Sequence, residues 1–471
     1  MGCIMKISPA DTIAAVATPP GEGALAVIRI SGPQSLQIGD RIFRGRRPLS
    51  TAPGYTLHHG TIVNQAGQDV DEVLAAVFRA PRSYTGEDAL EVSCHGGLFV
   101  TNGVLNAALA AGARRAEPGE FTRRAYLNGK MDLSRAEAVA ALISSRSDRA
   151  HRASLEQLRG RLAGTVEEMK SGLKRLCALL EVDLDFSEEG ISLIGKPEID
   201  RKIKEAKERL ERLAETFKTG RIYRDGVSVV IVGPPNAGKS SLFNALLKES
   251  RAIVTPIPGT TRDYLEETLT LGGILYRITD TAGLRKSEDP IESEGIARTF
   301  TSAETADIVL FVDDVGSDGV ERDALIGSLP VTGEQQLILV RNKIDLRSRS
   351  SEKLPRIDHV QLRGGIRTEV YLSALSGAGV HALAEELVHT AAGSEVSAGE
   401  TVSVISQRHA ESLGKGARSL GIALESLNAG MANEFVAFDI RESVSALGEI
   451  TGEITSEEIL NSIFDEFCIG K

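Results

Sequence analysis

The stretch that most restricts the fold is residues 233–240, GPPNAGKS, which fits the pattern GxxxxGK[ST]. An apolar run, VSVVIVG, precedes it, and a run with helical spacing, SSLFNALLK, follows it. The motif binds phosphate between a strand and a helix, where its backbone N–H groups converge on phosphate oxygens at the helix N-terminus. The sequence therefore predicts a strand, a phosphate loop and a helix, with Lys239 at the phosphates and Ser240 as a Mg²⁺ ligand.

Three further motifs follow in the order that a GTPase needs. DTAG at residues 280–283 ends a β-like run and can place a carboxylate near the metal. NKID at residues 342–345 ends another, and Asp345 can accept two hydrogen bonds that guanine offers and adenine does not. SAL at residues 373–375 can donate a backbone N–H to the guanine oxygen. The residues predicted to contact GTP in these motifs are Asn236, Ala237, Gly238, Lys239, Ser240, Ser241, Asp280, Thr281, Ala282, Gly283, Asn342, Lys343, Asp345, Ser373, Ala374 and Leu375.

One catalytic group is missing from this set. Ras-type GTPases carry a glutamine directly after DxxG to orient the attacking water, and this chain has Leu284 there. Another group has to orient the water, and the following loop offers the acids Glu288, Asp289, Glu292 and Glu294. On the sequence alone, a solvated surface charge is the favoured interpretation of each of these acids.

The chain as a whole predicts an α/β + α protein. Short β-like runs and one helical run fill the first part, and leucines at steps of three and four between residues 155 and 180 predict one long amphipathic helix. Residues 199–219 and 403–471 are also helical in pattern, and the last helix is expected to begin with a capping box at Thr455. Between them, apolar runs alternate with helical ones, which is typical of a doubly wound α/β domain. We expect an N-terminal α/β domain at residues 1–125, a helical domain at 126–224 and 393–471, and an inserted Ras-like GTPase (G) domain at 225–392.

Composition limits the class of protein. The net charge of −11 argues against a protein that coats nucleic acid indiscriminately. The four cysteines lie far apart without a CxxC spacing, which favours a reducing cytoplasm and no disulfide framework. No apolar run approaches the roughly 18 residues of a membrane helix, so no membrane association is expected. Residues 21–26, GEGALA, match a dinucleotide fingerprint but precede a β-like run, and we interpret them as a turn.

Several longer phrases are more specific than the phosphate loop. They are NAGKSSLFNALL, IVTPIPGTTRD and DTAGLR in the G domain, DTIAAVATPPGEGALAVIRISG, YTGEDALEVSCHGG and PGEFTRRAYLNGKMDLSRAEA in the first third, and the closing GEITGEITSEEILNSIFDEFCIGK. With these phrases the chain resembles the MnmE (TrmE) family of tRNA modification GTPases over essentially its whole length.

The resemblance implies a function and partners. Such proteins work with an FAD-dependent partner, MnmG, in a heterotetramer, and install an aminomethyl-type (carboxymethylaminomethyl) group on carbon five of the tRNA wobble uridine. The carbon comes from a tetrahydrofolate derivative, in the 5-formyl or methylene form. The N-terminal domain would bind folate and form a homodimer. The residues that match the folate positions are Arg29, Glu91, Lys130 and Lys471. Glu91 is equally readable as a residue at a sheet edge.

The resemblance also implies how GTP is hydrolysed without the glutamine. Two G domains pair, and K⁺ takes the place of an arginine finger. K⁺ would be held by Asn236, Thr255, Ile257 and Thr260, and Mg²⁺ by Ser240, Thr261 and Asp280. The loop Thr255, Pro256, Ile257, Pro258, Gly259, Thr260 and Thr261 would also contact GTP. Glu292 matches the water-orienting acid, with Glu294 as the alternative. Arg262 and Asp263, which directly follow Thr261, are further catalytic candidates.

Cys468 in the tail FCIGK has two open interpretations. A thiolate there could attack carbon six of the uridine and activate carbon five. The cysteine could instead only dock or order the tail. Cys94 is expected to be a packing residue. A rival class, a regulatory or ribosome-assembly GTPase without RNA chemistry, would have no use for folate, so folate binding separates the two.

Overall fold

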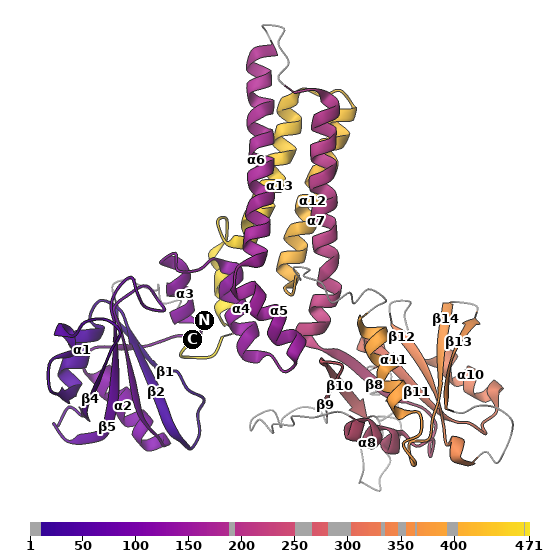
Figure 1. Cartoon of the computed structure of the whole chain (residues 1–471), viewed down its shortest axis with the longest axis horizontal. Coiled ribbons are helices and arrows are strands. Elements are labelled where there is room, and N and C mark those ends of the chain that lie inside the picture. The colour runs from indigo at the N-terminus through magenta and orange to yellow at the C-terminus, as the bar shows by residue number, and fades with distance from the viewer. Residues whose placement is uncertain are drawn as a thin grey trace. The chain divides into compact units, whose positions relative to one another are not determined.

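The computed structural model describes residues 11–187, 194–249, 266–280, 303–330, 335–346, 355–362, 365–392, 404–465 and 467–471 (Figure 1). The chain divides into two compact units. One holds residues 1–143, 157–204 and 418–471, and the other holds residues 144–156 and 205–417. Among the described residues, no helix is long and apolar enough to cross a membrane.

The first unit contains a seven-stranded sheet with the order β3-β4-β5-β6-β2-β1-β7, antiparallel except where β1 meets β7. Its strands are β1 (Ile13–Val16), β2 (Gly23–Ser31), β3 (Phe43–Gly45), β4 (Thr56–Val63), β5 (Asp69–Phe78), β6 (Ala89–Gly96) and β7 (Arg114–Arg115). Helices α1 (Ser35–Ile42) and α2 (Leu98–Ala110) cover one face, where Ile28, Leu90 and Cys94 join their core. Cys94 is 1% exposed, as expected of a packing residue, and burial raises the pKa of its thiol.

Helices complete the first unit. They are α3 (Glu120–Leu127), α4 (Leu133–Ser144), α6 (Arg161–Ser187), α13 (Asn433–Thr451) and α14 (Glu457–Asp465), and α13 packs along α6. Between these two helices, Cys177 of α6 lies buried beside Ala437 of α13.

Two sequence-based expectations for the helices are wrong. The long helix expected from the leucine spacing is interrupted between α5 (Asp148–Leu158) and α6, at Gly160. Gly160 has φ +84°, and a Cβ there would lie 2.1 Å from Arg135 Nη2, so the chain needs a glycine at this position. The last helix is capped by Ser456, whose Oγ accepts from Ile459 N–H at 3.3 Å, and not by a box at Thr455.

The second unit contains a seven-stranded sheet with the order β13-β14-β12-β11-β8-β10-β9. Its strands are β8 (Val227–Val232), β9 (Glu266–Leu271), β10 (Ile274–Asp280), β11 (Ile308–Asp314), β12 (Gln336–Asn342), β13 (Arg356–Leu362) and β14 (Gly365–Tyr371). The central strands are parallel, and β9–β10 is the antiparallel hairpin that the sequence predicts.

Apolar residues lie on both faces of this sheet. Helices α8 (Lys239–Glu249) and α11 (Val380–Ala392) contribute to one core, and residues beside α10 (Gly319–Ser328) contribute to the other. This two-sided cover explains why β8, β11 and β12 are nearly continuous apolar runs. The long helix α7 (Lys196–Asp225) reaches β8 through Gly226 alone, and α12 (Gln407–Asn428) follows the sheet in sequence. The predicted α/β + α class with a doubly wound sheet is confirmed.

Candidate functional sites

The phosphate loop lies where the sequence places it, between the end of β8 and the start of α8. Two of its glycines have no room for a side chain. A Cβ at Gly233 (φ +146°) would lie 2.0 Å from Val312 O, and one at Gly238 (φ +93°) would lie 2.3 Å from Asn342 Nδ2. Asn236, between them, has φ +60°, an uncommon conformation for a residue with a side chain. These glycines let the loop close tightly against neighbouring strand ends.

Lys239 points back across this loop. Its Nζ donates to Gly233 O at 2.8 Å and to Pro234 O at 2.9 Å. Lys239 and Ser240 are the first two residues of α8, so an ammonium, a hydroxyl and the free N–H groups of a helix N-terminus gather in one place. These groups fit a nucleotide phosphate with a Mg²⁺ ion, which Ser240 would help to hold.

Asn342 joins three of the predicted motifs. It is 2% exposed. Its Nδ2 donates to Ala237 O in the phosphate loop at 2.9 Å, and its Oδ1 accepts from Ala374 N–H in the SAL motif at 3.0 Å. Oδ1 also accepts from Lys343 N–H at 2.8 Å. Asn342 is therefore a bridge between the parts of the loop cluster that would hold phosphate and those that would hold the base.

Lys343 lies beside this bridge in a left-handed conformation, with φ +65°. Its Nζ pairs with Asp314 Oδ2 at 2.9 Å. A hydrogen bond from Gly316 N–H, together with the Lys343 ammonium, lowers the pKa of Asp314. Both residues line a cavity of about 270 Å³ next to Asn236. Asp314 was not foreseen from the sequence, although the two aspartates that end the apolar run FVDD at the carboxyl end of a strand were a usable signal.

Some of the remaining nucleotide candidates lie within the described residues, and others lie outside them. Asp345 and Leu375 lie at the surface, and Leu375 is 87% exposed. Asp280 is the last residue of β10 and pairs in register with Ile231 of β8. The candidates that lie outside the described residues are Thr255, Pro256, Ile257, Pro258, Gly259, Thr260, Thr261, Arg262, Asp263, Thr281, Ala282, Gly283, Glu288, Asp289, Glu292 and Glu294.

The folate candidates Arg29 and Glu91 lie opposite each other on neighbouring strands β2 and β6. Arg29 Nη2 and Glu91 Oε1 are 2.8 Å apart. The Arg29 guanidinium also lies 5.1 Å from the centre of the Tyr84 ring and 5.5 Å from that of Phe121. Burial raises the pKa of Tyr84, whose hydroxyl lies 2.9 Å from Thr122 Oγ1. A charged pair is thus held against aromatic rings on the sheet face that α1 and α2 leave uncovered.

The tail approaches this place from the other end of the chain. Ile469 forms an antiparallel bridge with Pro118, and Phe121 N–H donates to Lys471 O at 3.2 Å. Gly470 has φ +98°, and a Cβ there would lie 2.2 Å from Val16 O. Phe121 therefore contacts both the tail backbone and Arg29, which brings Lys471 near the Arg29–Glu91 pair.

Two further candidates from the sequence are Cys468, in the tail, and Lys130, which contacts the loop between β5 and β6. Cys468 is exposed, next to the docked Ile469, and Phe467 before it is buried in a cluster with Phe464 and Leu133. Lys130 follows α3, and its Nζ donates to Pro81 O at 2.9 Å.

A buried ion network holds α3, the helix that carries Phe121. Glu120 is 1% exposed and pairs with Arg114 at 2.6 Å and with Arg124 at 3.0 Å. Arg124, itself 3% exposed, also pairs with Glu87 at 3.1 Å and with Asp11. Burial alone would raise the pKa of Glu120, but the hydrogen bonds from Arg114 and Arg124 lower it. The network was not foreseen from the sequence.

Comparison with known proteins covers nearly the whole chain. A family model described as "MnmE helical domain" matches residues 133–468, and one described as "GTP-binding protein TrmE N-terminus" matches residues 12–130. Among curated relatives, the tRNA modification GTPase MnmE of Chlorobium luteolum is 43% identical and the match covers 98% of each chain. That of Salinibacter ruber is 43% identical over 99% of this chain and 100% of its own.

A third relative and one solved structure complete the comparison. The MnmE of Symbiobacterium thermophilum is 44% identical over 98% of this chain and 99% of its own. The G domain of the T. maritima FeoB iron transporter is 26% identical over 35% of this chain and 98% of that one, with a TM-score of 0.24, too low to support an argument. The relatives' description as GTPases agrees with the phosphate loop. This chain belongs to the MnmE family of tRNA modification GTPases.

Proposed function

We propose that this GTPase modifies carbon five of the wobble uridine of tRNA, together with an FAD-dependent partner of the MnmG type. The group installed is aminomethyl-type (carboxymethylaminomethyl), and its carbon is taken from a 5-formyl or methylene form of tetrahydrofolate. The observation that carries this proposal is the pair Arg29–Glu91 on the open sheet face, beside the docked tail.

The chemistry of this pair suits a folate. A carboxylate such as Glu91 accepts hydrogen bonds from the N–H donors of a pterin, and Arg29 beside it holds that carboxylate in place. Lys130 and Lys471 offer positive charge to the glutamate tail. Glu91 lies on a central strand, paired with both β2 and β5, so it is not a sheet-edge residue. Tyr84 and Phe121 add ring surface against which a flat heterocycle could pack.

The same sheet face supports a homodimer. In register, Glu91 lies between Arg29 and Ala76, and Ala76 faces Leu57, so the pair and Leu57 share one face. Leu74 lies two residues from Ala76 on that face and is 41% exposed, and Leu57 is 61% exposed. Leucines exposed on a regular sheet face favour a protein partner. We assign that partner as a second copy of the N-terminal domain.

For the G domain we propose hydrolysis in a pair of G domains with K⁺ in the place of an arginine finger. Asn236, in its left-handed conformation, would hold K⁺ together with Thr255, Ile257 and Thr260. Thr261 and Asp280 would join Ser240 at Mg²⁺. Either Glu292 or Glu294 would orient the water, and Arg262 and Asp263, which follow Thr261 in the sequence, are further catalytic candidates. Positive charge at the position of the arginine finger offsets the charge that develops in the transition state.

We consider two roles for Cys468, as a nucleophile or as part of a tail that only docks. The thiol is exposed and follows the buried Phe467, so it is presented from a fixed backbone and could attack carbon six of the uridine. Alternatively, the tail docks only through Phe467, Ile469 and Gly470, and the sulfur takes no part in chemistry.

The experiment is nucleoside mass spectrometry of tRNA from cells that lack this gene, complemented with wild type, Glu91→Gln or Cys468→Ser. We expect the aminomethyl uridines to disappear without the gene and to return with wild type. Glu91→Gln should restore little while GTP hydrolysis remains, because glutamine keeps one acceptor oxygen but replaces the other with an N–H donor and removes the charge that pairs with Arg29. Full restoration by Cys468→Ser would assign the tail a docking role. Unchanged nucleosides in the deletion strain, with no second copy of the gene, would show the proposed function to be wrong.

A further inference from the structure

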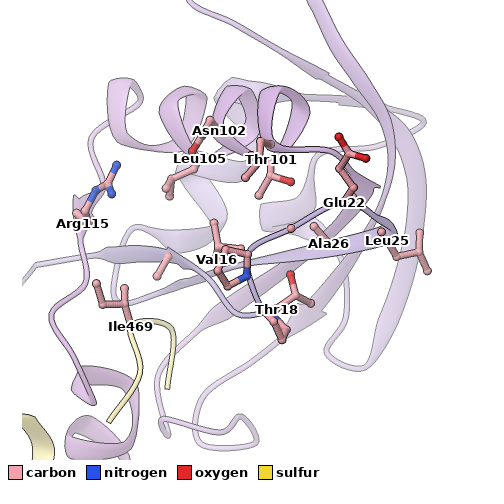
Figure 2. Close-up of a pocket in the computed structure, with 17 residues that line it drawn as sticks. Val16, Thr18, Glu22, Leu25, Ala26, Thr101, Asn102, Leu105, Arg115 and Ile469 are labelled. Carbon is pink, nitrogen blue, oxygen red and sulfur yellow. The ribbon is translucent and has the colours of Figure 1, made fainter. Parts of the chain in front are cut away.

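A cavity of about 420 Å³ lies in the first unit between helix α2 and the loop that joins β1 to β2 (Figure 2). Its walls include Val16, Leu105 and, from the tail, Ile469. The four folate candidates are not among the residues that line it. Small-ligand sites are commonly cavities of about 300–1,000 Å³ with apolar walls and a few polar groups. By size and lining this cavity is a second candidate site, separate from the Arg29–Glu91 pair.

Two opposite charges line the cavity at its ends. Glu22, in the β1–β2 loop, and Arg115, in β7, lie at opposite ends of the view in Figure 2, and Asn102 of α2 lies between them. Within the part of the chain that the structure describes, none of these three side chains forms a hydrogen bond or an ion pair with another residue. The lining thus fits an elongated ligand with a hydrogen-bond donor at one end, an anion at the other and an apolar-packing body between them.

We propose that this cavity receives a uridine nucleotide of the RNA substrate. A phosphate would lie at Arg115, where a guanidinium can make two hydrogen bonds to it. The uracil would lie at the other end, with its N3–H donated to the Glu22 carboxylate. Cytosine has no hydrogen on N3, so Glu22 selects uracil over cytosine. Asn102 can reach the ribose hydroxyls or a base carbonyl between the two ends.

The known and proposed activities agree with this assignment. The family acts on tRNA, and enzymes that modify a base take it out of the stack and hold it by its Watson–Crick edge between apolar side chains. The assignment of uracil rests on the proposed function, in which the modified base is a uridine. Phe99 is 92% exposed and follows Leu98, which lines the cavity, so it can stack with a neighbouring base. Ile469 in the wall places Cys468 next to the cavity.

The first test is a calorimetric titration of the full chain, saturated with GDP to fill the G domain, with uridine 5′-monophosphate and cytidine 5′-monophosphate. Wild type should bind the uridine nucleotide at least about tenfold more tightly. Glu22→Gln should abolish that preference, and Arg115→Gln should weaken binding of the uridine nucleotide by about tenfold. Arg47→Gln, at an exposed arginine outside the cavity, is the matched control and should change nothing. Equal binding of both nucleotides, or none, overturns the proposal, and so does competition by a tetrahydrofolate derivative.

The second test locates the base in RNA. An anticodon stem-loop with 4-thiouridine at the wobble position is irradiated in complex with the full chain, and the crosslinked peptides are mapped by mass spectrometry. Crosslinks to residues 18–26 or 98–105 support the cavity. Crosslinks elsewhere in this chain overturn the cavity assignment and leave the tRNA function intact. The proposed function is judged independently, by the nucleosides of the deletion strain.

Discussion

The amide nitrogen of Asn342 lies 2.9 Å from the carbonyl oxygen of Ala237, so a residue of the NKID motif fixes the phosphate loop directly. Both residues are 2% exposed, and a buried polar group that loses its partner costs about 1–3 kcal/mol. Asn342→Ala should therefore weaken binding of a fluorescent GDP analogue by about tenfold or more, measured by equilibrium titration. Asn64→Ala, in the exposed turn after β4, serves as control. An unchanged affinity of Asn342→Ala would contradict the bridging role.

The ion pair between Asp314 and Lys343 gives a second prediction. Both side chains are about a third exposed, and such pairs contribute at most ~1 kcal/mol. Asp314→Asn should raise KM for GTP about two- to fivefold and leave kcat unchanged, because the carboxylate positions Lys343 and does not touch the reacting atoms. Asp318→Asn is the matched control. It removes a charge from the same cavity, and asparagine still caps α10 in place of the Asp318 side chain. A fall in kcat at constant KM would show that Asp314 acts in another way.

The network around Glu120 predicts a pH-dependent stability. Glu120→Gln removes the one fully buried carboxylate of the network, so that Arg114 and Arg124 keep only the partly exposed Asp11 and Glu87, and should lower the free energy of unfolding by about 3 kcal/mol at pH 7. The folded-state pKa of Glu120 lies below the ordinary glutamate value of 4.5. Its stabilisation is therefore complete above pH 4.5 and is lost as the pH falls through the folded pKa.

Urea denaturation of wild type and Glu120→Gln at pH 7 and at pH 3 measures this dependence. The difference in unfolding free energy should shrink at pH 3, because the Glu120 carboxyl of the unfolded wild-type chain takes up a proton there while the folded-state pKa lies lower. Glu117→Gln, at a neighbouring exposed position, should show no such dependence. A difference that stays constant between the two pH values would mean that the charge of Glu120 is not what stabilises α3.

More of the nucleotide site than of the N-terminal site could be predicted from the sequence. GPPNAGKS, NKID and SAL each end a parallel strand, and parallel strands of one sheet end at the same edge, so the convergence at Asn342 follows from the pattern. The nearness of Arg29 to Glu91 depends on β2 pairing with β6, across strands β3 to β5, which no local pattern specifies. The resemblance implies only that Arg29 and Glu91 both match folate positions, and their pairing is known from the structure.

The helix errors have a common physical origin. The leucine spacing continues across Gly160 because both helices bury one face, so hydrophobic periodicity alone cannot locate the break. The break coincides with Gly160, whose φ of +84° lies outside the helical range and is one that residues with a side chain rarely adopt. At the last helix, Thr455 and Ser456 can both act as caps, and only the backbone path decides which hydroxyl reaches an N–H.

Gly470 gives the last prediction, because its conformation decides whether the tail can dock. Alanine there would be strained at φ +98° and would place its Cβ 2.2 Å from Val16 O, which is backbone and cannot move aside easily. Gly470→Ala should therefore release the tail and break the hydrogen bond from Phe121 N–H to Lys471 O. Hydrogen exchange of the Phe121 amide should accelerate at least about tenfold.

The control variant is Gly67→Ala. Gly67 has φ +76° but no atom within 4 Å of a Cβ added there, so this variant isolates the backbone strain from the clash. The GTPase rate should be unchanged in both variants, since the tail and the phosphate loop belong to different units. If Phe121 remains protected in Gly470→Ala, the tail is held by Phe467 and Ile469 alone, and the fit of Gly470 against β1 is not required for docking.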